Sequence, residues 1–416
     1  MAEVLPLKAV HYDLGKVALG DVTAPPYDVI DAAKRADLVG RSPHNVVEID
    51  LPEAPDEGDR YEHAARLMEK WKDDGVLTAD EEPTLWALEQ DYTGPDGRSH
   101  TRRGILCRVR LAEYGEGAIR PHERTQPGPK EDRLRLTRAT RHNLSPIFSL
   151  HPGTTWELLG GAPEGEPWGE ATDEDGTVHR VWKIDDAAVH GAVRDALADA
   201  ELLIADGHHR YETALTYARE VGGDGEHQYV FMALVSLEDP GLTVFATHRL
   251  LTDLDSAKQE ALRDTVTELF DVSEVSRDEL IPGAEDGPAA FGYMDAHHKA
   301  PRKLTLKDPA VLDEALAGHS DAYRRLDAAA LEALILRRAL GLTEDDIAAK
   351  RGLAYQSSLE GALAKLDSGE ADAAFFLRPT PVEQVRAVAA AGETMPPKST
   401  YFFPKLLTGI VFNPLE

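Results

Sequence analysis

The sequence predicts a mixed α+β protein of two to three domains, and three observations support this fold class. The chain has 416 residues, whereas a typical domain has roughly 150. Hydrophobic residues make up 42% of the chain and charged residues 29%, an ordinary globular composition that argues against global disorder. Segments with apolar residues at helical spacing also alternate with strand-like segments along the whole chain.

The first part of the chain predicts a loop, a strand, a helix and a hairpin, in that order. Two prolines in TAPPYDVI, residues 23–30, disfavour a helix and predict a fixed loop. The segment NVVEIDL, residues 45–51, is rich in β-forming side chains and predicts a strand. Residues 59–76 have apolar side chains at helical spacing. Residues 84–92 and 102–111 predict a β-hairpin, because a Pro/Gly turn segment lies between them.

The rest of the chain is predicted to alternate between strands and helices. The apolar strand ELLIAD, residues 201–206, runs directly into a helical segment, GHHRYETALTYARE, residues 207–220. A domain boundary is expected near residue 250. The other expected elements are strands at residues 178–184, 228–237, 242–251, 289–296, 302–308 and 373–377, and helices at residues 186–200, 255–270, 328–339, 359–366 and 382–391.

The charge of the chain excludes some classes of partner. Lysine and arginine number 45 against 74 aspartate and glutamate residues, which gives a net charge of −29. A surface this acidic repels phosphate backbones over most of its area. We therefore expect no nucleic-acid or membrane partner, although a small basic pocket for a phosphorylated small molecule stays open. No apolar run approaches the roughly 18 residues that a membrane-spanning helix needs.

The single cysteine and the absent motifs narrow the function further. Cys107 lies in the apolar segment GILCRVRL, and one cysteine permits neither an intrachain disulfide nor a multi-cysteine zinc site. No signal peptide is visible in the first residues, so we expect a cytoplasmic protein in which Cys107 is a small buried side chain. The sequence has no P-loop, dinucleotide-binding glycine pattern, HExxH or GxSxG, which disfavours the common nucleotide-binding and hydrolase scaffolds.

The most informative segment is LLIADGHHRYETAL, residues 202–215. An apolar strand ends at Asp206, Gly207 permits a tight turn, and His208, His209 and Arg210 occupy the first turn of a helix. The N–H groups of that turn favour an anion, Arg210 offers a planar fork suited to phosphate oxygens, and the histidines can donate hydrogen bonds. Asp206 could hold a magnesium ion or orient a histidine. The alternatives are a solvated helix cap and, more weakly, a zinc site.

A second segment is the basic stretch from Arg120 to Arg141, which is unusual in a chain of net charge −29. Glu123 lies between His122 and Arg124 in a Pro-bounded loop. A lone carboxylate among cations is suited to take a proton from a hydroxyl beside a bound polyphosphate. The alternative is structural: a surface ion pair at Glu123 and a helix face whose basic residues pair with neighbouring carboxylates.

A third segment follows two prolines near the end of the chain. Lys398, Ser399 and Thr400 lie in the rigid loop of ETMPPKSTYFFPK. A lysine with two hydroxyl groups predicts a pocket for a carboxylate or a phosphate, and the alternative is an ordinary exposed turn.

At these segments the chain resembles the free serine kinases, which are built on a ParB-like fold. The family's Pro-His-Glu segment is matched by residues 121–123, and its Asp-Gly-His-His-Arg motif is matched in full by residues 206–210. Its Gly-Glu-(hydrophobic)-Asp and Pro-Lys-(Ser/Thr)-Thr motifs are matched by residues 369–372 and 397–400. The order is preserved, and the resemblance covers about residues 118–416.

The resemblance implies a fold and a reaction. The expected domains are an N-terminal α/β extension at 1–117, a ParB-like phosphate-binding core at 118–250 and a C-terminal α/β domain at 251–416. The expected reaction transfers a phosphoryl group from ATP or ADP, with Mg²⁺, to the hydroxyl of free L-serine and yields O-phosphoserine. The site is expected in the cleft between the core and the C-terminal domain, where Lys398 would meet Asp206.

The resemblance also implies a role for each candidate residue. The roles are catalysis for Glu123, Asp206 and His208, phosphate and nucleotide binding for Gly207, His209, Arg210 and Arg124, substrate contact for His122, Lys398, Ser399 and Thr400, and magnesium binding for Asp206.

The chain departs from the archaeal pattern in two places. Tyr401 and Phe402 stand where those kinases have Arg-His, and the N-terminal extension matches only a widespread bacterial family of unknown function. A different small hydroxylated substrate therefore stays open, as does a nucleotide-binding regulatory module of ParB-like type without kinase activity. The oligomeric state and the role of the Pro25–Asp28 loop also stay open.

Overall fold

The computed structural model describes residues 2–54, 58–94, 97–115, 117–123, 125 and 127–416. The chain forms two compact units. The first consists of Met1–Pro121, Thr125–Thr243 and Pro404–Glu416, and the second of His122–Arg124 and Val244–Phe403. The predicted division at 117/118 and 250/251 differs from these bounds and stays a prediction.

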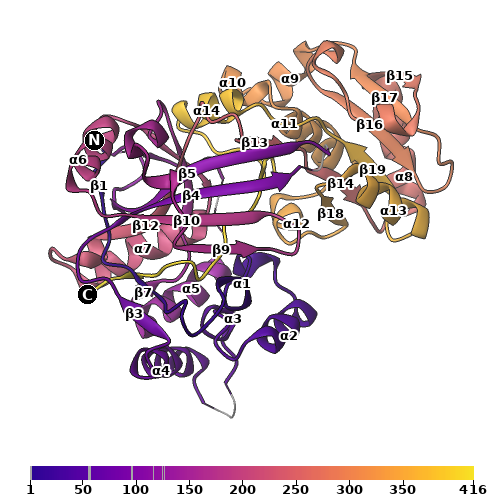
Figure 1. Cartoon of the computed structure of the whole chain (residues 1–416). Coiled ribbons are helices and arrows are strands. Elements are labelled where there is room, and N and C mark those ends of the chain that lie inside the picture. Colours follow the sequence, from indigo (N-terminus) through magenta and orange to yellow (C-terminus); the bar gives the residue numbers. More distant parts are fainter. Residues whose placement is uncertain (1, 55–57, 95–96, 116, 124, 126) are drawn as a thin grey trace. The chain divides into compact units, whose positions relative to one another are not determined.

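A mixed sheet forms the centre of the first unit (Figure 1). Among the described residues, nine strands follow the order β6-β11-β8-β12-β5-β4-β10-β9, with β1 beside β5. Neighbours run antiparallel except for the pairs β6–β11 and β8–β12. The strands are β1 (Val4–Leu5), β4 (Leu85–Thr93), β5 (Ser99–Arg110), β6 (Ile119–Arg120), β8 (Ile147–His151), β9 (Gly169–Thr172), β10 (Val178–Ile184), β11 (Leu202–Asp206) and β12 (Tyr229–Ser236).

Helices and two short ribbons complete the first unit. The helices are α1 (Leu19–Val22), α2 (Ala32–Arg41), α3 (Val47–Asp50), α4 (Arg60–Asp73), α5 (Pro127–Thr140), α6 (Ala187–Leu197) and α7 (His208–Val221). The ribbons pair β2 (Val10–Tyr12) with β3 (Leu77–Ala79) and β7 (His142–Asn143) with β21 (Asn413–Pro414).

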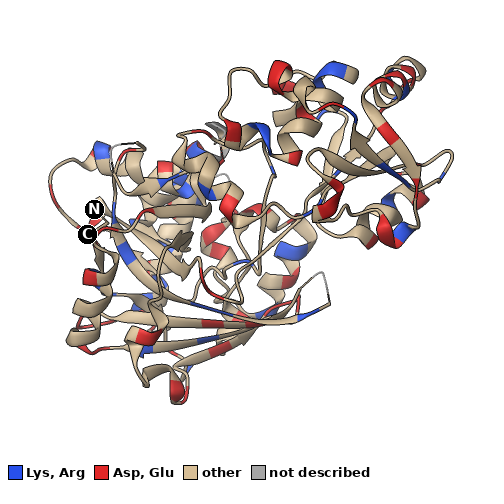
Figure 2. Ribbon diagram, turned by 90° about the horizontal axis from the view of Figure 1, so that it is seen from above, with Lys and Arg blue, Asp and Glu red and all other residues tan. Residues whose placement is uncertain are grey.

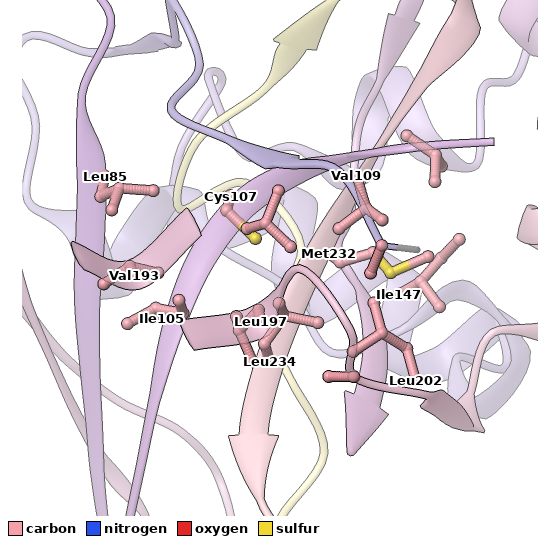
Figure 3. Packing of buried hydrophobic residues seen from close by; sticks show 14 of the residues in the cluster. Leu85, Ile105, Cys107, Val109, Ile147, Val193, Leu197, Leu202, Met232 and Leu234 are labelled. Atoms are coloured by element: carbon pink, nitrogen blue, oxygen red, sulfur yellow. The ribbon is translucent and has the colours of Figure 1, made fainter. Parts of the chain in front are cut away.

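The core of the first unit lies on one face of β5. Ile105, Cys107 and Val109 alternate along this strand and pack with Met232 of β12 and Leu197 of α6 (Figure 3). The predicted burial of the cysteine is confirmed, because its side chain has no exposed surface. Burial raises the pKa of the Cys107 thiol, which keeps it protonated and unreactive.

The predicted strand at residues 45–51 is wrong, because Val47–Asp50 forms the short helix α3. The Asn45 side chain accepts a hydrogen bond from the Val47 N–H and donates to the carbonyl oxygens of Asp21 and Thr23. These contacts fix a helical turn and override the β propensity of the valines.

The second unit has its own antiparallel sheet. Its described strands follow the order β15-β17-β16-β19-β14-β18, and β13 pairs with β20 separately. The predicted strand at 242–251 is interrupted at Ala246–Thr247, which separates β13 from β14. The strands are β13 (Thr243–Phe245), β14 (His248–Leu251), β15 (Phe270–Glu274), β16 (Ala290–Asp295), β17 (Arg302–Leu306), β18 (Leu353–Gln356), β19 (Ala373–Phe376) and β20 (Tyr401–Phe403).

Helices pack around this second sheet, and Leu250, Met294 and Phe376 lie in its core. The helices are α8 (Ser256–Leu269), α9 (Ala310–Ala315), α10 (Asp321–Arg324), α11 (Asp327–Leu331), α12 (Glu344–Ala348), α13 (Leu359–Ser368) and α14 (Val382–Ala390), and a π-helical segment, Glu332–Ala339, follows α11.

The mixture of helices and sheets confirms the α+β class, whereas the ParB-like topology stays a prediction. Acidic and basic residues are interspersed along the ribbons of both units (Figure 2). No helix within the described ranges is long and apolar enough to cross a bilayer.

A buried histidine of the second unit makes stability depend on pH. The His248 Nδ1 atom accepts a hydrogen bond from the Leu377 N–H, and burial lowers the pKa of His248 from 6.5 to about 4. Between about pH 4 and pH 6.5, His248 is therefore protonated in the unfolded chain but neutral in the folded chain. The stability that depends on neutral His248 is therefore complete above pH 6.5 and is lost as the pH falls towards 4.

We expect His248→Phe to flatten this pH dependence, because the phenyl ring cannot be protonated. Urea unfolding of both proteins between pH 7 and pH 4 provides the measurement. At pH 7 the variant should be less stable than the unmodified protein, since the Leu377 N–H loses its acceptor. On acidification, however, its free energy of unfolding should fall by a smaller amount. Equal slopes in the two proteins would contradict the assignment.

Candidate functional site

The Asp206–Arg210 motif forms a strand-to-helix junction in the first unit. Strand β11 ends at Asp206, and Gly207 adopts a left-handed conformation with φ 99° and ψ 25° immediately before α7 begins at His208. A Cβ atom at Gly207 would lie 3.0 Å from Nη2 of Arg210 and would also strain the backbone. Glycine is therefore favoured here mainly for its conformation, and a larger residue would also displace the Arg210 guanidinium slightly.

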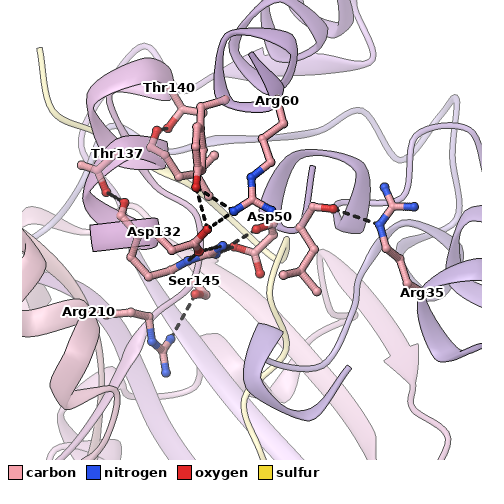
Figure 4. Close-up of polar contacts among 12 residues, drawn as sticks. Arg35, Asp50, Arg60, Asp132, Thr137, Thr140, Ser145 and Arg210 are labelled. Carbon is pink, nitrogen blue, oxygen red and sulfur yellow. Dashed lines mark hydrogen bonds and ion pairs between the residues drawn. The ribbon is translucent and has the colours of Figure 1, made fainter. Parts of the chain in front are cut away.

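Charged groups at this junction favour an anion. The first turn of α7 contains no acidic residue, so its N–H groups and the helix dipole present positive potential. The Asp206 carboxylate lies between two cations, with Arg210 Nη2 3.4 Å from Oδ2 and Lys405 Nζ 3.3 Å from Oδ1. Arg210 Nη1 also donates to Ser145 Oγ at 3.0 Å (Figure 4). His208 is buried and His209 is half-buried.

Lys405 was missed by the sequence analysis. No local pattern marks it, because its proximity to Asp206 depends on how the C-terminal segment returns to the first unit.

The described residues around Asp206 show no preformed cluster of metal ligands. Within the part of the chain that the structure describes, no three or more His, Cys, Asp and Glu side chains are arranged to hold a metal ion. The one carboxylate of the junction, Asp206, has Arg210 and Lys405 beside it. A cation would have to compete with both positive charges. The magnesium role of Asp206 therefore stays a prediction without supporting ligands.

The Pro25–Asp28 loop lies beside this junction. The guanidinium of Arg133 lies 4.3 Å from the centroid of the Tyr27 ring, and its Nη1 donates to Asp50 Oδ1 at 2.9 Å. Burial raises the pKa of Tyr27 to about 12, and the charges of Arg210 and Arg133 oppose this rise. The N-terminal loop is therefore within electrostatic reach of Arg210.

The basic stretch of α5 is mostly structural. Arg133 binds Asp50 and Asp132, and the other pairs join Lys130 to Glu212, Arg135 to Asp59 and Arg138 to Glu220. The structural alternative for these residues is therefore the better interpretation. Arg124, predicted to bind phosphate, lies outside the described residues.

The Lys398–Thr400 loop belongs to the second unit and is held by several hydrogen bonds. Lys398 has a φ of 56°, a left-handed conformation that is uncommon for a residue with a side chain. Ser399 Oγ donates to the Pro396 carbonyl at 2.6 Å, and Thr380 Oγ1 donates to the Ser399 carbonyl at 2.9 Å. Such an enforced conformation is typical of functional loops.

The Pro-His-Glu segment meets this loop within the second unit. His122 is buried, and its Nε2 atom lies 3.0 Å from Thr400 Oγ1. Glu123 forms a parallel bridge with Met395, whose N–H donates to the His122 carbonyl at 2.7 Å. Four of the predicted substrate and catalytic residues, His122, Glu123, Ser399 and Thr400, are thus connected through one loop.

Arg249 is a buried cation that the sequence analysis missed. Its side chain belongs to β14, donates from Nη2 to the Pro397 carbonyl at 3.1 Å and stacks 5.2 Å from the Tyr355 ring. Burial lowers the pKa of Arg249, and nearby Tyr355, Glu332 and Glu123 raise it. Glu123 is therefore close enough to Arg249 for the two charges to interact. The segment THRLL reads simply as a strand, and nothing in it indicates this role.

These residues fall into two clusters, one in each unit. The first contains Asp206–Arg210 with Lys405, and the second contains His122, Glu123, Arg249 and Lys398–Thr400. The expected meeting of Lys398 with Asp206 stays a prediction.

A pair of substitutions at Lys398 should separate its side chain from its backbone. We expect both Lys398→Gly and Lys398→Ala to impair an activity that depends on the ammonium group. Glycine adopts a positive φ without strain, whereas alanine keeps the backbone strain of the lysine. The free energy of unfolding in urea should therefore be higher for the glycine variant, by up to about 1 kcal/mol. Equal stability of the two variants would show that the loop conformation is not strained.

Comparisons with known proteins give weak structural matches. A free serine kinase in complex with AMP is 14% identical, with 72% of this chain and 88% of that chain covered and a TM-score of 0.37. SbnI with a C-terminal truncation, from Staphylococcus aureus, is 13% identical over 70% of this chain and 82% of its own, with a TM-score of 0.35. Both TM-scores lie below 0.5. No curated protein matches the chain.

A family model covers most of the sequence, from residue 4 to residue 329. The match includes the Pro-His-Glu segment and the whole Asp206–Arg210 junction, and it ends before the Lys398 loop. The chain therefore belongs to the family described as "Protein of unknown function (DUF1015)".

Proposed function

We propose that the protein is a small-molecule kinase that transfers a phosphoryl group from ATP or ADP to the hydroxyl of free L-serine. The observation that carries this proposal is the Asp206–Arg210 junction. There a left-handed glycine, the start of α7, Arg210 and Lys405 lie together, which supports binding of an anion. The resemblance of the Asp-Gly-His-His-Arg, Pro-His-Glu and Pro-Lys-Ser-Thr motifs to the free serine kinases supports the same reaction.

The proposed step conserves atoms and charge. Glu123 takes the proton of the serine hydroxyl, and the hydroxyl oxygen forms a bond to the terminal phosphorus. The bond between that phosphorus and the bridging oxygen breaks, and ADP or AMP leaves with the negative charge. Arg210, His209 and the N–H groups of α7 stabilise the phosphoryl oxygens. The products are O-phosphoserine and the shortened nucleotide, and no step is assigned to magnesium.

The second cluster supports an acceptor that carries a carboxylate. Arg249 is a buried cation that donates to the Thr247 and Pro397 carbonyl oxygens, and Lys398 adds an exposed ammonium group on the neighbouring loop. Charge-assisted hydrogen bonds to a carboxylate are stronger than those to a neutral alcohol. An amino acid or a hydroxy acid is therefore favoured over a simple alcohol as the acceptor.

A substrate screen tests the proposal. The purified chain is incubated with ATP or ADP and a panel of amino acids and hydroxy acids, and AMP, ADP and phosphoserine are measured by mass spectrometry. We expect serine-dependent nucleotide consumption with formation of phosphoserine. Nucleotide consumption with a different acceptor would identify that compound, in place of serine, as the substrate. Tight binding of duplex DNA at low salt, without nucleotide consumption, would favour the regulatory module instead.

A further inference from the structure

We propose that Lys405 is a phosphate-binding residue of the anion site and that a buried polar network through the sheet holds it in place. The inference rests on the proposed function, because it assigns a nucleotide phosphate to the Asp206–Arg210 junction. It adds a cation that none of the motifs contains, together with the residues that position it.

Lys405 approaches the junction from the C-terminal segment of the first unit. Its Nζ atom lies 3.3 Å from Asp206 Oδ1, and Arg210 lies at the other carboxylate oxygen. Two cations thus flank the Asp206 carboxylate at the start of α7. About three quarters of the Lys405 side chain is covered, since 23% is exposed, so its charge is less screened by solvent than that of a surface lysine. A phosphate bound at the first turn of α7 would find a second positive charge here.

The main chain at Lys405 is held by two buried side chains. Arg102 Nη2 donates to the Pro404 carbonyl at 2.6 Å, and Gln90 Nε2 donates to the Lys405 carbonyl at 3.3 Å. Both side chains are 1% exposed. They lie opposite each other on β5 and β4, and Arg102 Nε also donates to Gln90 Oε1 at 3.0 Å. The residue that carries the ammonium group is thus tied to the centre of the sheet.

The network continues to the next strand. His179 of β10 lies opposite Gln90, and its Nδ1 atom is 3.1 Å from Gln90 Nε2. The other ring nitrogen, Nε2, lies 3.0 Å from Asp173 Oδ2. Because the Gln90 amide donates to both the Lys405 carbonyl and Nδ1, His179 must be the tautomer that donates from Nε2 to Asp173. The donors and acceptors of Gln90, His179 and Asp173 are therefore complementary along this part of the network.

Burying the charged Arg102 side chain has a high desolvation cost, which indicates a role beyond packing. Its guanidinium lies 4.5 Å from the centroid of the Phe148 ring, and burial lowers its pKa to about 10. The group therefore stays charged at neutral pH inside the protein. A buried charge contributes little net stability compared with apolar residues of similar size, but it can fix one geometry. Here the fixed geometry is that of Pro404–Lys405.

The first experiment compares nucleotides by calorimetry. We expect Lys405→Ala to weaken ADP binding roughly ten- to a hundredfold and to leave adenosine binding unchanged, because a charge-assisted hydrogen bond to phosphate is lost. Lys405→Arg should recover part of the loss. Lys70→Ala on α4, which removes an exposed lysine from the same unit, serves as the matched control. Unchanged ADP affinity in Lys405→Ala would overturn the proposal.

The second experiment tests the positioning network. Arg102→Met should reproduce the selective loss of ADP affinity, although residue 102 does not contact the ligand, and Arg102→Lys should recover little because it cannot reach both Gln90 and Pro404. Equal losses for ADP and adenosine would indicate general destabilisation and overturn the positioning role. If Arg102→Met does not fold, Arg102→Lys decides the question.

These binding measurements separate this inference from the kinase proposal. ADP binding that depends on Lys405, without phosphoserine formation, would refute the kinase reaction and retain the phosphate-binding role. No ADP binding by the unmodified chain would refute both.

Discussion

Replacing Glu123 with glutamine should lower serine phosphorylation by roughly 10²-fold or more and leave ADP affinity close to that of the unmodified protein. The amide keeps the shape and hydrogen bonding of the side chain but cannot accept the hydroxyl proton. The main-chain bridge of residue 123 with Met395 does not use the side chain, so the loop should keep its position. Turnover from product formation and ADP affinity from calorimetry give the two measurements.

Glu360 provides the matched control for Glu123. Glu360→Gln removes an exposed carboxylate from α13 of the same unit and should leave turnover unchanged. Near-normal turnover of Glu123→Gln in a folded protein would make Glu123 a structural residue. The base would then be sought first at Asp206 and next at Asp28.

Arg210→Ala should cause the second large effect, a roughly tenfold or greater loss of ADP affinity together with reduced turnover. The guanidinium is already oriented by Ser145 Oγ at 3.0 Å and by the Pro146 carbonyl, so the cost of ordering it is met before a phosphate arrives. Arg210→Lys keeps the charge but loses the planar fork, and we expect it to recover only part of the affinity.

The same helix offers the control for Arg210. Arg219→Ala removes an exposed arginine from the last turn of α7, where it pairs with Glu113. This variant changes the net charge equally but lies away from the first turn, so ADP affinity should not change. Equal losses in the two variants would mean that net charge, rather than the Arg210 fork, decides binding.

Some of the site could be predicted because its information is local. The junction at residues 202–215 combines an apolar strand, one glycine and a helical pattern within a few residues, and the structure forms these elements at β11, Gly207 and α7. The Pro-Lys-Ser-Thr loop is equally local, and the two prolines restrict it before any tertiary contact forms. Short-range sterics and hydrogen bonds are enough to specify such segments.

Other site residues depend on partners that are remote in the chain. Arg249 reads as part of an ordinary strand, and Lys405 lies within an otherwise mostly apolar segment. Lys405 lies beside Asp206, and Gln90 and Arg102, on two neighbouring strands, bind the main chain at Pro404–Lys405. No local pattern encodes a contact between residues so far apart in sequence.

The sequence by itself determined the α+β class, most of the helices and strands, the burial of Cys107 and the strand–glycine–helix junction, because periodicity and glycine conformation act over a few residues. Tertiary structure alone decided the rest. It made residues 47–50 a helix through the contacts of Asn45, joined the N-terminal strands to β12 in one sheet and brought Tyr27 near Arg210. It also placed Lys405 beside Asp206. The physical reason is that burial and ion pairing depend on which remote segments come together, and these contacts outweigh local preferences.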